Sequence, residues 1–155
     1  MTIAPTLQSY LDQNVVYDII PHDPSMTSSR TAQACHVPGG CLAKGVVLRY
    51  NGRYVLAVLP ASHHLDLPGF KERFGGDAAL ASENEFSQLF SDCARGAVPP
   101  IGNCYGLDVF IDDSLSDRPE IYMEAGDHET LVRMGRSEFA KLTGNAQHAR
   151  FSLHD

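Results

Sequence analysis

The sequence predicts an α+β fold, with a mixed, twisted and barrel-like β-sheet core surrounded by helices. Short runs of β-branched and apolar residues follow one another along the chain, and helical patterns separate only some of them. The dipeptide Asn51-Gly52 joins two such runs and favours a type I′ hairpin, because both of its positions tolerate positive φ. Strands that arrive as neighbours in this way are less typical of a doubly wound parallel sheet.

Helices are predicted by apolar spacing and by capping signals. Apolar spacing indicates a first helix over residues 7–13 and a last helix over residues 137–142. A polar loop can supply the N-cap of a helix over residues 30–37, which Pro38-Gly39-Gly40 ends. The segment Ser82-Glu83-Asn84-Glu85 has the pattern of a capping box and opens a further helix.

Strands are predicted wherever β-branched and apolar residues gather between turn signals. The predicted strands cover residues 15–20, 42–50, 53–59, 107–111, 120–124 and 130–134. No internal repeat, low-complexity tract or linker separates them, so all of these elements should share one core.

The length and composition predict a single domain. The chain has 155 residues, 43% of them hydrophobic, which is enough for one sizeable core. We expect the domain to cover residues 4–145 and a C-terminal tail to cover residues 146–155. No apolar run is long enough to span a bilayer, and the N-terminus lacks the features of a secretory signal. The sequence therefore predicts a cytoplasmic protein with no membrane partner.

The charge and the glycine pattern exclude several functions. A formal net charge of −7 argues against broad binding to a nucleic-acid backbone, which depends on accumulated Lys and Arg contacts. We therefore expect no DNA partner, and any RNA contact should be small and local. Gly39-Gly40 and Gly75-Gly76 lack the spacing and the following Lys-Ser/Thr of a phosphate-binding loop. Nucleotide hydrolysis is not expected, and no motif indicates a cofactor.

The cysteines are predicted to be free thiols. Cys35, Cys41, Cys93 and Cys104 are too few for a disulfide scaffold, and no CxxC spacing occurs. Their spacing relative to the histidines matches no common zinc pattern, so no metal is predicted. Cys93 with a distant histidine could form a thiol nucleophile, but no local signature supports this, and a small buried residue is the more common role.

Lys44 stands out as a charged residue in an apolar strand. Alternation places it on the same face as Leu42, Val46 and Leu48. An unpaired buried ammonium is costly, so the side chain must either snorkel to solvent or project into a polar cavity. Judged from the residues alone, the snorkelling or exposed position is the more common one.

The segment over residues 96–102 is predicted to be a stiff loop. Gly96 and Gly102 permit unusual backbone conformations, while Pro99 and Pro100 fix φ and lack N–H groups. Such a loop can hold its remaining N–H groups towards a developing oxyanion, as acyl transfer requires. Without further context, an ordinary tight connection is the better interpretation.

The order of these features resembles the YbaK/ProX family, which includes free-standing deacylases and the editing domain of some prolyl-tRNA synthetases. The most specific pieces are Lys44 and the GxxxPxG pattern over residues 96–102. The other segments that carry the resemblance are Ser29-Arg30-Thr31-Ala32-Gln33-Ala34, Leu42-Ala43-Lys44-Gly45-Val46-Val47-Leu48, Ala57-Val58-Leu59-Pro60-Ala61, Leu65-Asp66-Leu67, residues 85–93, Asp112-Asp113-Ser114-Leu115 and Glu124-Ala125-Gly126-Asp127-His128.

The resemblance implies hydrolysis of the ester that joins a wrong amino acid to tRNA, without a metal or another cofactor. By position, Lys44 would help to hold the aminoacyl-adenosine end, and the loop opened by Gly96 would stabilise the tetrahedral intermediate. The substrate-binding residues expected on this basis are Pro99, Pro100, Gly102, Asp112, Gly126 and His128, although a surface position in an acidic turn is an equal alternative for His128. Judged from charge alone, Arg30 is a further candidate for contact with the tRNA end. Mischarged tRNA is the implied partner, contacted at its acceptor end, and an aminoacyl-tRNA synthetase is a second candidate.

Some properties stay open at this point. Residues after the lysine differ between family members with different amino-acid preferences, and here Gly45 follows it. The sequence therefore names neither the amino acid nor the tRNA, nor whether water or the ribose hydroxyl attacks. A catalytically silent tRNA- or synthetase-binding module of the same fold is the alternative, because a shared fold does not guarantee a shared function.

Overall fold

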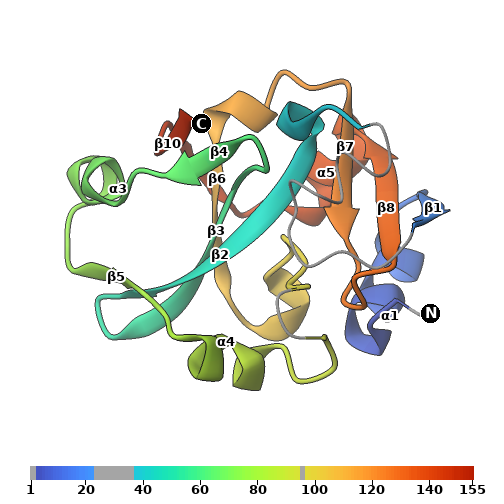
Figure 1. Ribbon diagram of the computed structural model, residues 1–155, viewed down its shortest axis with the longest axis horizontal. Coiled ribbons are helices and arrows are strands. Elements are labelled where there is room, and N and C mark those ends of the chain that lie inside the picture. The colour runs from blue at the N-terminus through green and yellow to red at the C-terminus, as the bar shows by residue number, and fades with distance from the viewer. Residues whose placement is uncertain (1–2, 23–36, 95–96) are drawn as a thin grey trace.

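The computed structural model describes residues 3–22, 37–94 and 97–155 (Figure 1). The helices described are α1 (Pro5–Asn14), α3 (Leu67–Phe74), α4 (Glu83–Leu89) and α5 (Arg136–Leu142), with short 3-10 turns η1 (Gly39–Cys41), η2 (Asn103–Tyr105) and η3 (Asp113–Leu115). The strands are β1 (Asp18–Pro21), β2 (Leu42–Tyr50), β3 (Arg53–Pro60), β4 (His63–Leu65), β5 (Ala78–Leu80), β6 (Asp108–Asp112), β7 (Glu120–Glu124), β8 (Thr130–Gly135), β9 (Gln147–Ala149) and β10 (Ser152–His154).

Eight strands form one mixed sheet, which confirms the predicted α+β class. Its order is β1-β8-β7-β2-β3-β6-β9, and β5 pairs with β2 outside this path. The pairs β2–β7, β3–β6 and β6–β9 are parallel, whereas the remaining pairs are antiparallel. In Figure 1 the long β2–β3 ribbon crosses the molecule diagonally, while β7 and β8 stand more upright beside it. Strands β4 and β10 form a separate two-stranded sheet.

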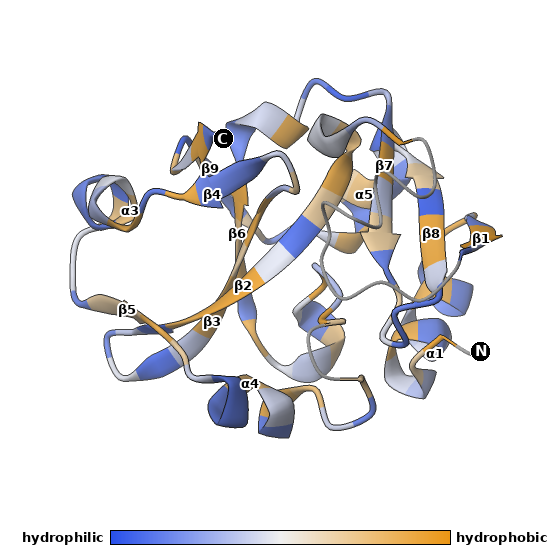
Figure 2. Ribbon diagram, viewed as in Figure 1, coloured by the Kyte–Doolittle hydropathy of each residue, from blue (hydrophilic) through white to orange (hydrophobic). Residues whose placement is uncertain are grey.

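The central hairpin forms as the sequence predicts. Asn51 and Gly52 have φ values of 51° and 81°, as the two central positions of a type I′ turn require. The hairpin pairs Leu48 with Val55, and Val47 with Leu56. Figure 2 shows that β3 is hydrophobic along most of its length, with hydrophilic residues near the hairpin end.

Alternation along the hairpin divides the core between its two faces. One face packs against α1 and α5 in the main core, which includes Ala43, Val47, Leu56 and Val58. The other face packs against α3 in an aromatic cluster. The buried members of this aromatic cluster are Leu48, Val55, Ala57, Phe70, Ala78, Phe110 and Phe151. Because both faces are covered, β2 and β3 are nearly continuous hydrophobic runs.

Several elements differ from the sequence prediction. The first strand, expected over residues 15–20, begins only at Asp18, because Val15 still caps α1 through its N–H bond to Leu11. Helix α3 was not predicted, although Asp66 caps it by accepting a hydrogen bond from the Gly69 N–H. The helix expected over residues 30–37 lies, except for its last residue, outside the described residues.

The last ten residues take part in the fold. Residues 146–155 were expected to form a C-terminal tail, and they contain β9, which pairs with β6, and β10, which pairs with β4. Phe151 between them is fully buried in the aromatic cluster. Strands of three residues are too short to produce a recognisable alternation, which explains why the sequence does not show them.

Candidate active site

Lys44 lies on β2, on the sheet face that alternation predicted. It is half-buried, and its Nζ donates a 2.5 Å hydrogen bond to the main-chain carbonyl of His63. Burial lowers the pKa of Lys44 below its ordinary value, and the negative charge of Asp155 opposes this effect. The side chain therefore neither snorkels freely nor lies unpaired.

The loop over residues 97–102 packs directly against the residue after Lys44. A Cβ atom at Gly45 would lie 3.3 Å from the carbonyl oxygen of Pro99 and 3.4 Å from Cα of Pro100. It would also lie 2.9 Å from Cδ1 of Leu56, which is closer than real Cβ contacts allow. Glycine at position 45 thus lets the loop approach the lysine strand.

The same loop is anchored at its other end by Gly102. Its carbonyl accepts hydrogen bonds from the N–H groups of Tyr105 (3.0 Å) and Leu107 (2.9 Å). A Cβ atom at Gly102 would lie only 2.8 Å from Cγ2 of Val109. Space, rather than an unusual backbone angle, therefore requires glycine here, and the loop is held on the main core.

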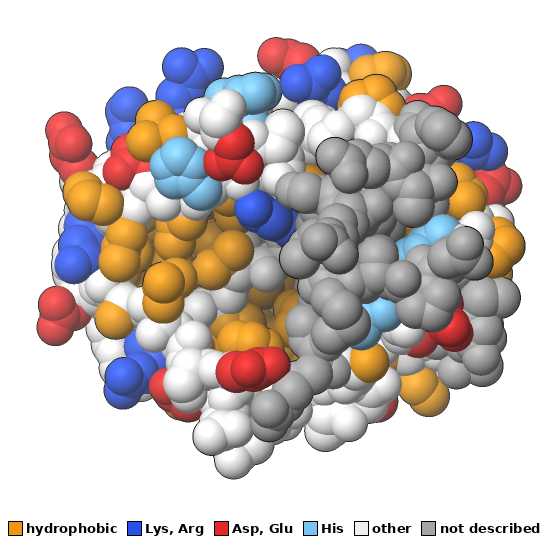
Figure 3. All heavy atoms as spheres, in the orientation of Figure 1, with side chains coloured by type: hydrophobic (Ala, Val, Ile, Leu, Met, Phe, Trp, Pro, Cys, Tyr) orange, Lys and Arg blue, Asp and Glu red, His pale blue; other side chains and the backbone are white. Residues whose placement is uncertain are grey.

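Lys44 and this loop line one cavity of about 310 Å³. Lys44 is its only charged lining residue among those described, and the rest are apolar. The lining residues are Lys44, Gly45, Val46, Val47, Leu80, Ala81, Phe86 and Val98. Figure 3 shows hydrophobic side chains in a hollow near the middle of this face, with a basic side chain beside them. The cavity offers an apolar wall and one ammonium group.

Helix α4 supplies Phe86 to this cavity and is fixed by the predicted capping box. Ser82 Oγ accepts a hydrogen bond from the Glu85 N–H (3.2 Å), and the Glu85 carboxylate accepts one from the Ser82 N–H (3.0 Å). Glu85 also binds the Tyr54 hydroxyl at 2.5 Å and pairs with Arg49 at 3.3 Å. The capping box therefore joins the helix to the β2–β3 hairpin.

Gly126 and His128 lie in a tight segment that supports the chain leading into the loop. Gly126 has φ 102°, and its carbonyl accepts a 2.6 Å hydrogen bond from the Ala94 N–H. A Cβ atom at Gly126 would lie 3.2 Å from Sγ of Cys93. His128 has φ 62° and is 8% exposed. Positive φ is open to glycine at position 126, whereas it is an uncommon conformation for His128, which is buried in this turn.

Asp112 is buried and holds neighbouring backbone. It is 1% exposed, and its Oδ1 accepts a 2.7 Å hydrogen bond from the Phe151 N–H. Its Oδ2 accepts hydrogen bonds from the N–H (3.0 Å) and the hydroxyl of Ser114. These contacts support a structural role, in which Asp112 ties the C-terminal segment to the end of β6.

The described cysteines are free thiols. Burial raises the pKa of Cys93 to about 12 and that of Cys104 to about 11, so both are protonated at neutral pH. Within the described ranges, no three His, Cys, Asp or Glu side chains gather in a group that could hold a metal ion. No described helix is long and apolar enough to cross a membrane.

A family model described as the aminoacyl-tRNA editing domain matches residues 22–142. The chain belongs to this family. The matched range contains Lys44, the loop over residues 97–102, Gly126 and His128. The resemblance seen in the sequence is thus confirmed at the level of the family.

Solved structures agree with this assignment. A proposed trans-editing enzyme for prolyl tRNA synthetase matches with 26% identity and a TM-score of 0.83, covering 98% of this chain and 99% of that chain. A scaffold protein from a study of epitope backbone grafting matches with 25% identity and a TM-score of 0.83, covering 97% of each chain. The hypothetical protein APE2540, at 22% identity with a TM-score of 0.83 and coverage of 96% and 99%, supports the fold alone. A search of curated proteins found no match.

Two predicted site residues of this editing domain cannot be placed. Gly96, expected to open the catalytic loop, and Arg30, expected to bind substrate, both lie outside the described residues. Pro99, Pro100 and Gly102 are buried, and the first two contact the Gly45 position. The structure thus brings Lys44 and the described part of the loop together.

Arg118 is a cation near the site that the sequence did not single out. This half-buried residue lies against η1, because a Cβ atom at Gly40 would be 2.7 Å from its Nη2 atom. Burial lowers the pKa of His63, and the positive charge of Arg118 is a smaller contribution in the same direction. The Arg118 guanidinium forms no ion pair with any described carboxylate. Its guanidinium lies near the start of β2, the strand that contains Lys44.

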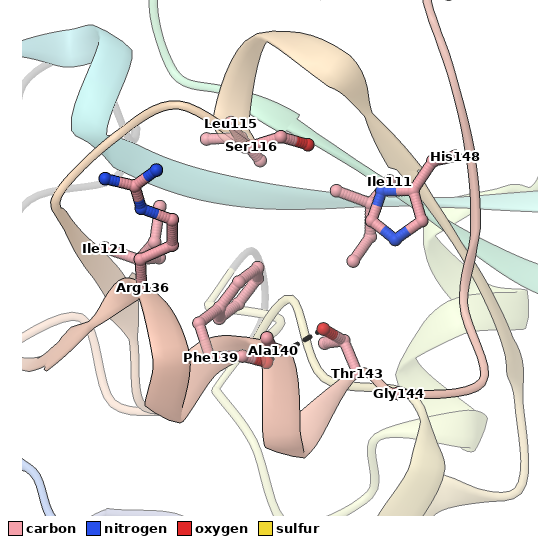
Figure 4. A pocket seen from close by; sticks show the side chains of 10 residues that line it. All are labelled: Ile111, Leu115, Ser116, Ile121, Arg136, Phe139, Ala140, Thr143, Gly144 and His148. Atoms are coloured by element: carbon pink, nitrogen blue, oxygen red, sulfur yellow. Dashed lines mark hydrogen bonds between the residues drawn. The ribbon is translucent and has the colours of Figure 1, made fainter.

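The editing domain has a second cavity, of about 340 Å³, between α5 and residues of β6, η3, β7 and β9. Figure 4 shows Arg136 and Phe139 on α5 at one side of it and His148 at the other. Thr143 in its wall donates a 2.8 Å hydrogen bond to the Phe139 carbonyl. This cavity shares no lining residue with the Lys44 cavity.

Proposed function

We propose that this editing domain hydrolyses the ester bond of mischarged aminoacyl-tRNA at the 3′ end. The observation that carries the proposal is the common cavity of Lys44 and Val98, formed where the loop contacts Gly45. Membership of the editing-domain family and the likeness to a proposed trans-editing enzyme support the same conclusion. Mischarged tRNA is the proposed partner, and a synthetase that delivers it is a second one.

Lys44 acts as the charged anchor of the substrate. An ammonium group has three N–H donors, and one of them is used by the carbonyl of His63. The other two can bind oxygen atoms of the terminal adenosine or of the ester. The fixed hydrogen bond to His63 reduces the conformational freedom that binding would otherwise have to remove.

The loop supplies oriented donors for the reaction. Pro99 and Pro100 have no N–H groups, and the Ala97 N–H is bonded to the Ala94 carbonyl. The Val98 N–H forms no hydrogen bond to another described residue, and Val98 lines the cavity. It is therefore the described loop donor best placed to stabilise an oxyanion, beside the expected contribution of Gly96.

The chemistry needs no protein nucleophile. Water or the neighbouring ribose hydroxyl adds to the ester carbonyl carbon and gives up a proton, which ends on the leaving ribose oxygen, while the oxyanion faces the loop N–H donors. Collapse of this tetrahedral intermediate breaks the bond to the ribose oxygen, which takes up a proton as the tRNA hydroxyl. When the ribose hydroxyl attacks, water must then hydrolyse the new ester. Protonated Cys93 and Cys104 fit a mechanism without a thiolate.

Arg118 contacts a phosphate near the tRNA end in this proposal. The net charge of −7 disfavours a wide RNA footprint, so one or a few local contacts should suffice. Arg49 and Arg53 already pair with Glu85 and Asp108. Arg118 has no such partner among the described residues, and its planar guanidinium suits phosphate oxygens.

The test is a panel of mischarged tRNAs, including alanyl-, cysteinyl- and seryl-tRNA of the proline type. We expect deacylation of at least one member well above the spontaneous rate. Folded protein that deacylates none of them, with a working control enzyme, would contradict the proposal. Stable tRNA binding without turnover would instead support a catalytically silent binding module.

A further inference from the structure

The C-terminal strand β10 supports the carbonyl that binds Lys44. Strand β4, which contains His63, has β10 as its sheet partner. The Asp155 N–H donates to the Ser62 carbonyl (3.0 Å), and the Asp66 N–H donates to the Phe151 carbonyl (2.8 Å). Hydrogen-bonded pairs alternate along an antiparallel ladder, so His63 and His154 form a non-hydrogen-bonded pair. The carbonyl of His63 therefore points away from β10 and accepts the hydrogen bond that Lys44 Nζ donates.

Side chains of β10 fix His63 as well. His63 Nδ1 and Ser152 Oγ are 2.8 Å apart, and Ser152 is only 6% exposed. The rings of His63 and His154 meet edge to face, with centroids 5.2 Å apart. Burial lowers the pKa of His63, so its ring is neutral at pH 7 and can share a hydrogen bond with the serine.

Asp155 adds a negative charge beside the site. Its Oδ1 lies 2.8 Å from Nδ1 of His64, and the His64 hydrogen bond is the main cause that lowers the pKa of Asp155. The charge of Lys44 lowers the pKa of Asp155 further, while Asp155 opposes the effect of burial on Lys44. The two groups are therefore electrostatically coupled.

We propose that β10 and the following residue Asp155 are part of the active site. As positioning residues, Ser152 holds the His63 ring and Asp155 holds the adjoining Ser62 carbonyl and the His64 ring, so that the His63 carbonyl stays in place to bind the Lys44 ammonium. This inference rests on the proposed function, because it assigns a task to Lys44. It goes beyond the family match, since residues 152–155 lie after the matched range that ends at residue 142. The charged and titratable groups that affect the pKa of His63 are Asp112, His154, Asp155 and Arg118.

The first test is independent of editing activity. The chain has three lysines, Lys44, Lys71 and Lys141, so the side-chain NMR signals of selectively labelled lysine can be assigned by substitution. Asp155→Asn should lower the pKa of Lys44 by about half a unit, because it removes an opposite charge. Ser152→Ala should shift the Lys44 signals, and Ser152→Thr, which keeps the hydroxyl, should restore them.

The matched control is Leu153→Thr, which changes an exposed side chain on the same strand. It should leave the Lys44 signals and the Lys44 pKa unchanged, and the Lys71 and Lys141 signals serve as references in every variant. If Asp155→Asn and Ser152→Ala also leave the Lys44 signals and the Lys44 pKa unchanged, the proposal is wrong. Thermal unfolding of each variant shows whether a shift merely reflects loss of the fold.

The second test uses deacylation kinetics on the best tRNA of the panel. Ser152→Ala should raise KM and lower kcat about tenfold together, since a misplaced anchor affects both binding and the transition state. Ser152→Thr should recover most of this loss. Unchanged kinetics would overturn the positioning role. If the wild-type protein has no activity but the Lys44 signals still respond to Ser152→Ala and Asp155→Asn, only the proposed function is contradicted.

Discussion

Gly45 packs directly against Pro100, so that a methyl group at position 45 would fill the space between the lysine strand and the loop. The Cβ of an alanine at position 45 would be 3.4 Å from Cα of Pro100 and 3.3 Å from the Pro99 carbonyl oxygen. This approach places the loop beside the strand that carries Lys44, and Val98 of the loop lines the same cavity as Lys44. The geometry of the site therefore depends on glycine, which has no side chain, at position 45.

Gly45→Ala should impair deacylation through this contact. Leu56 must shift to admit the methyl group and the loop must give slightly, and a displacement that grows to about 1 Å at the site can cost roughly ten- to a hundredfold in rate. Crowding should also cost about 1–3 kcal/mol of unfolding free energy, measured with urea. Gly135→Ala is the control, because nothing lies within 4 Å of the added Cβ there. A Gly45→Ala enzyme as active as this control would show that the loop contact is unimportant.

Substrate binding should weaken at high pH as Lys44 loses its proton. Its pKa is lowered below the ordinary value of 10.5, chiefly by burial, so the charged anchor disappears earlier than for an exposed lysine. A non-hydrolysable amide analogue of aminoacyl-adenosine should therefore bind less tightly as the pH rises through this lowered pKa. Lys44→Arg keeps its charge and should show no such fall. Identical pH profiles for both proteins would argue against the anchor.

Removal of Arg118 should weaken tRNA binding without affecting chemistry. Arg118→Gln should raise Kd for tRNA, and the slope of log K against log salt should fall by about one. Arg136→Gln, which removes the same charge beside the second cavity, is the matched control. Equal salt slopes for the two variants would exclude a specific phosphate contact at Arg118.

Glu85 should stabilise the fold in a pH-dependent way. Its hydrogen bonds with Tyr54 and Ser82 lower its pKa from 4.5 to about 2. A carboxylate with a depressed pKa contributes stability that is present above pH 4.5 and is lost as the pH falls towards 2. Wild type should thus be more stable than Glu85→Gln at neutral pH, and the difference should shrink through this window. Urea unfolding that shows a constant difference would refute this role.

Features set by neighbouring residues could be predicted from the sequence. The Asn51-Gly52 turn and the capping box at Ser82 and Glu85 depend on a few consecutive residues, and both form as predicted. Strand β7 also has the predicted bounds. The face of Lys44 followed from alternation alone. Local chemistry therefore determined these elements.

Contacts between distant segments could not be predicted in this way. His63 lies 19 positions from Lys44 and binds it through a main-chain carbonyl, which no side-chain pattern reveals. Ser152 contacts the ring of His63, 89 positions away, and Asp112 accepts a hydrogen bond from the N–H of Phe151, 39 positions away. Strand β10 has only three residues, so its pairing depends on the finished fold. The candidate site could be inferred from the sequence only through the family resemblance.

The most direct test of the central claim is single-turnover deacylation of the preferred mischarged tRNA by wild type, Lys44→Ala and Lys141→Ala. Lys141 is an exposed lysine paired with Glu138, so its loss controls for the removal of a positive charge. We predict that Lys44→Ala loses about a hundredfold or more in rate while remaining folded, and that Lys141→Ala keeps the wild-type rate. A folded Lys44→Ala protein that deacylates as fast as Lys141→Ala would contradict the account.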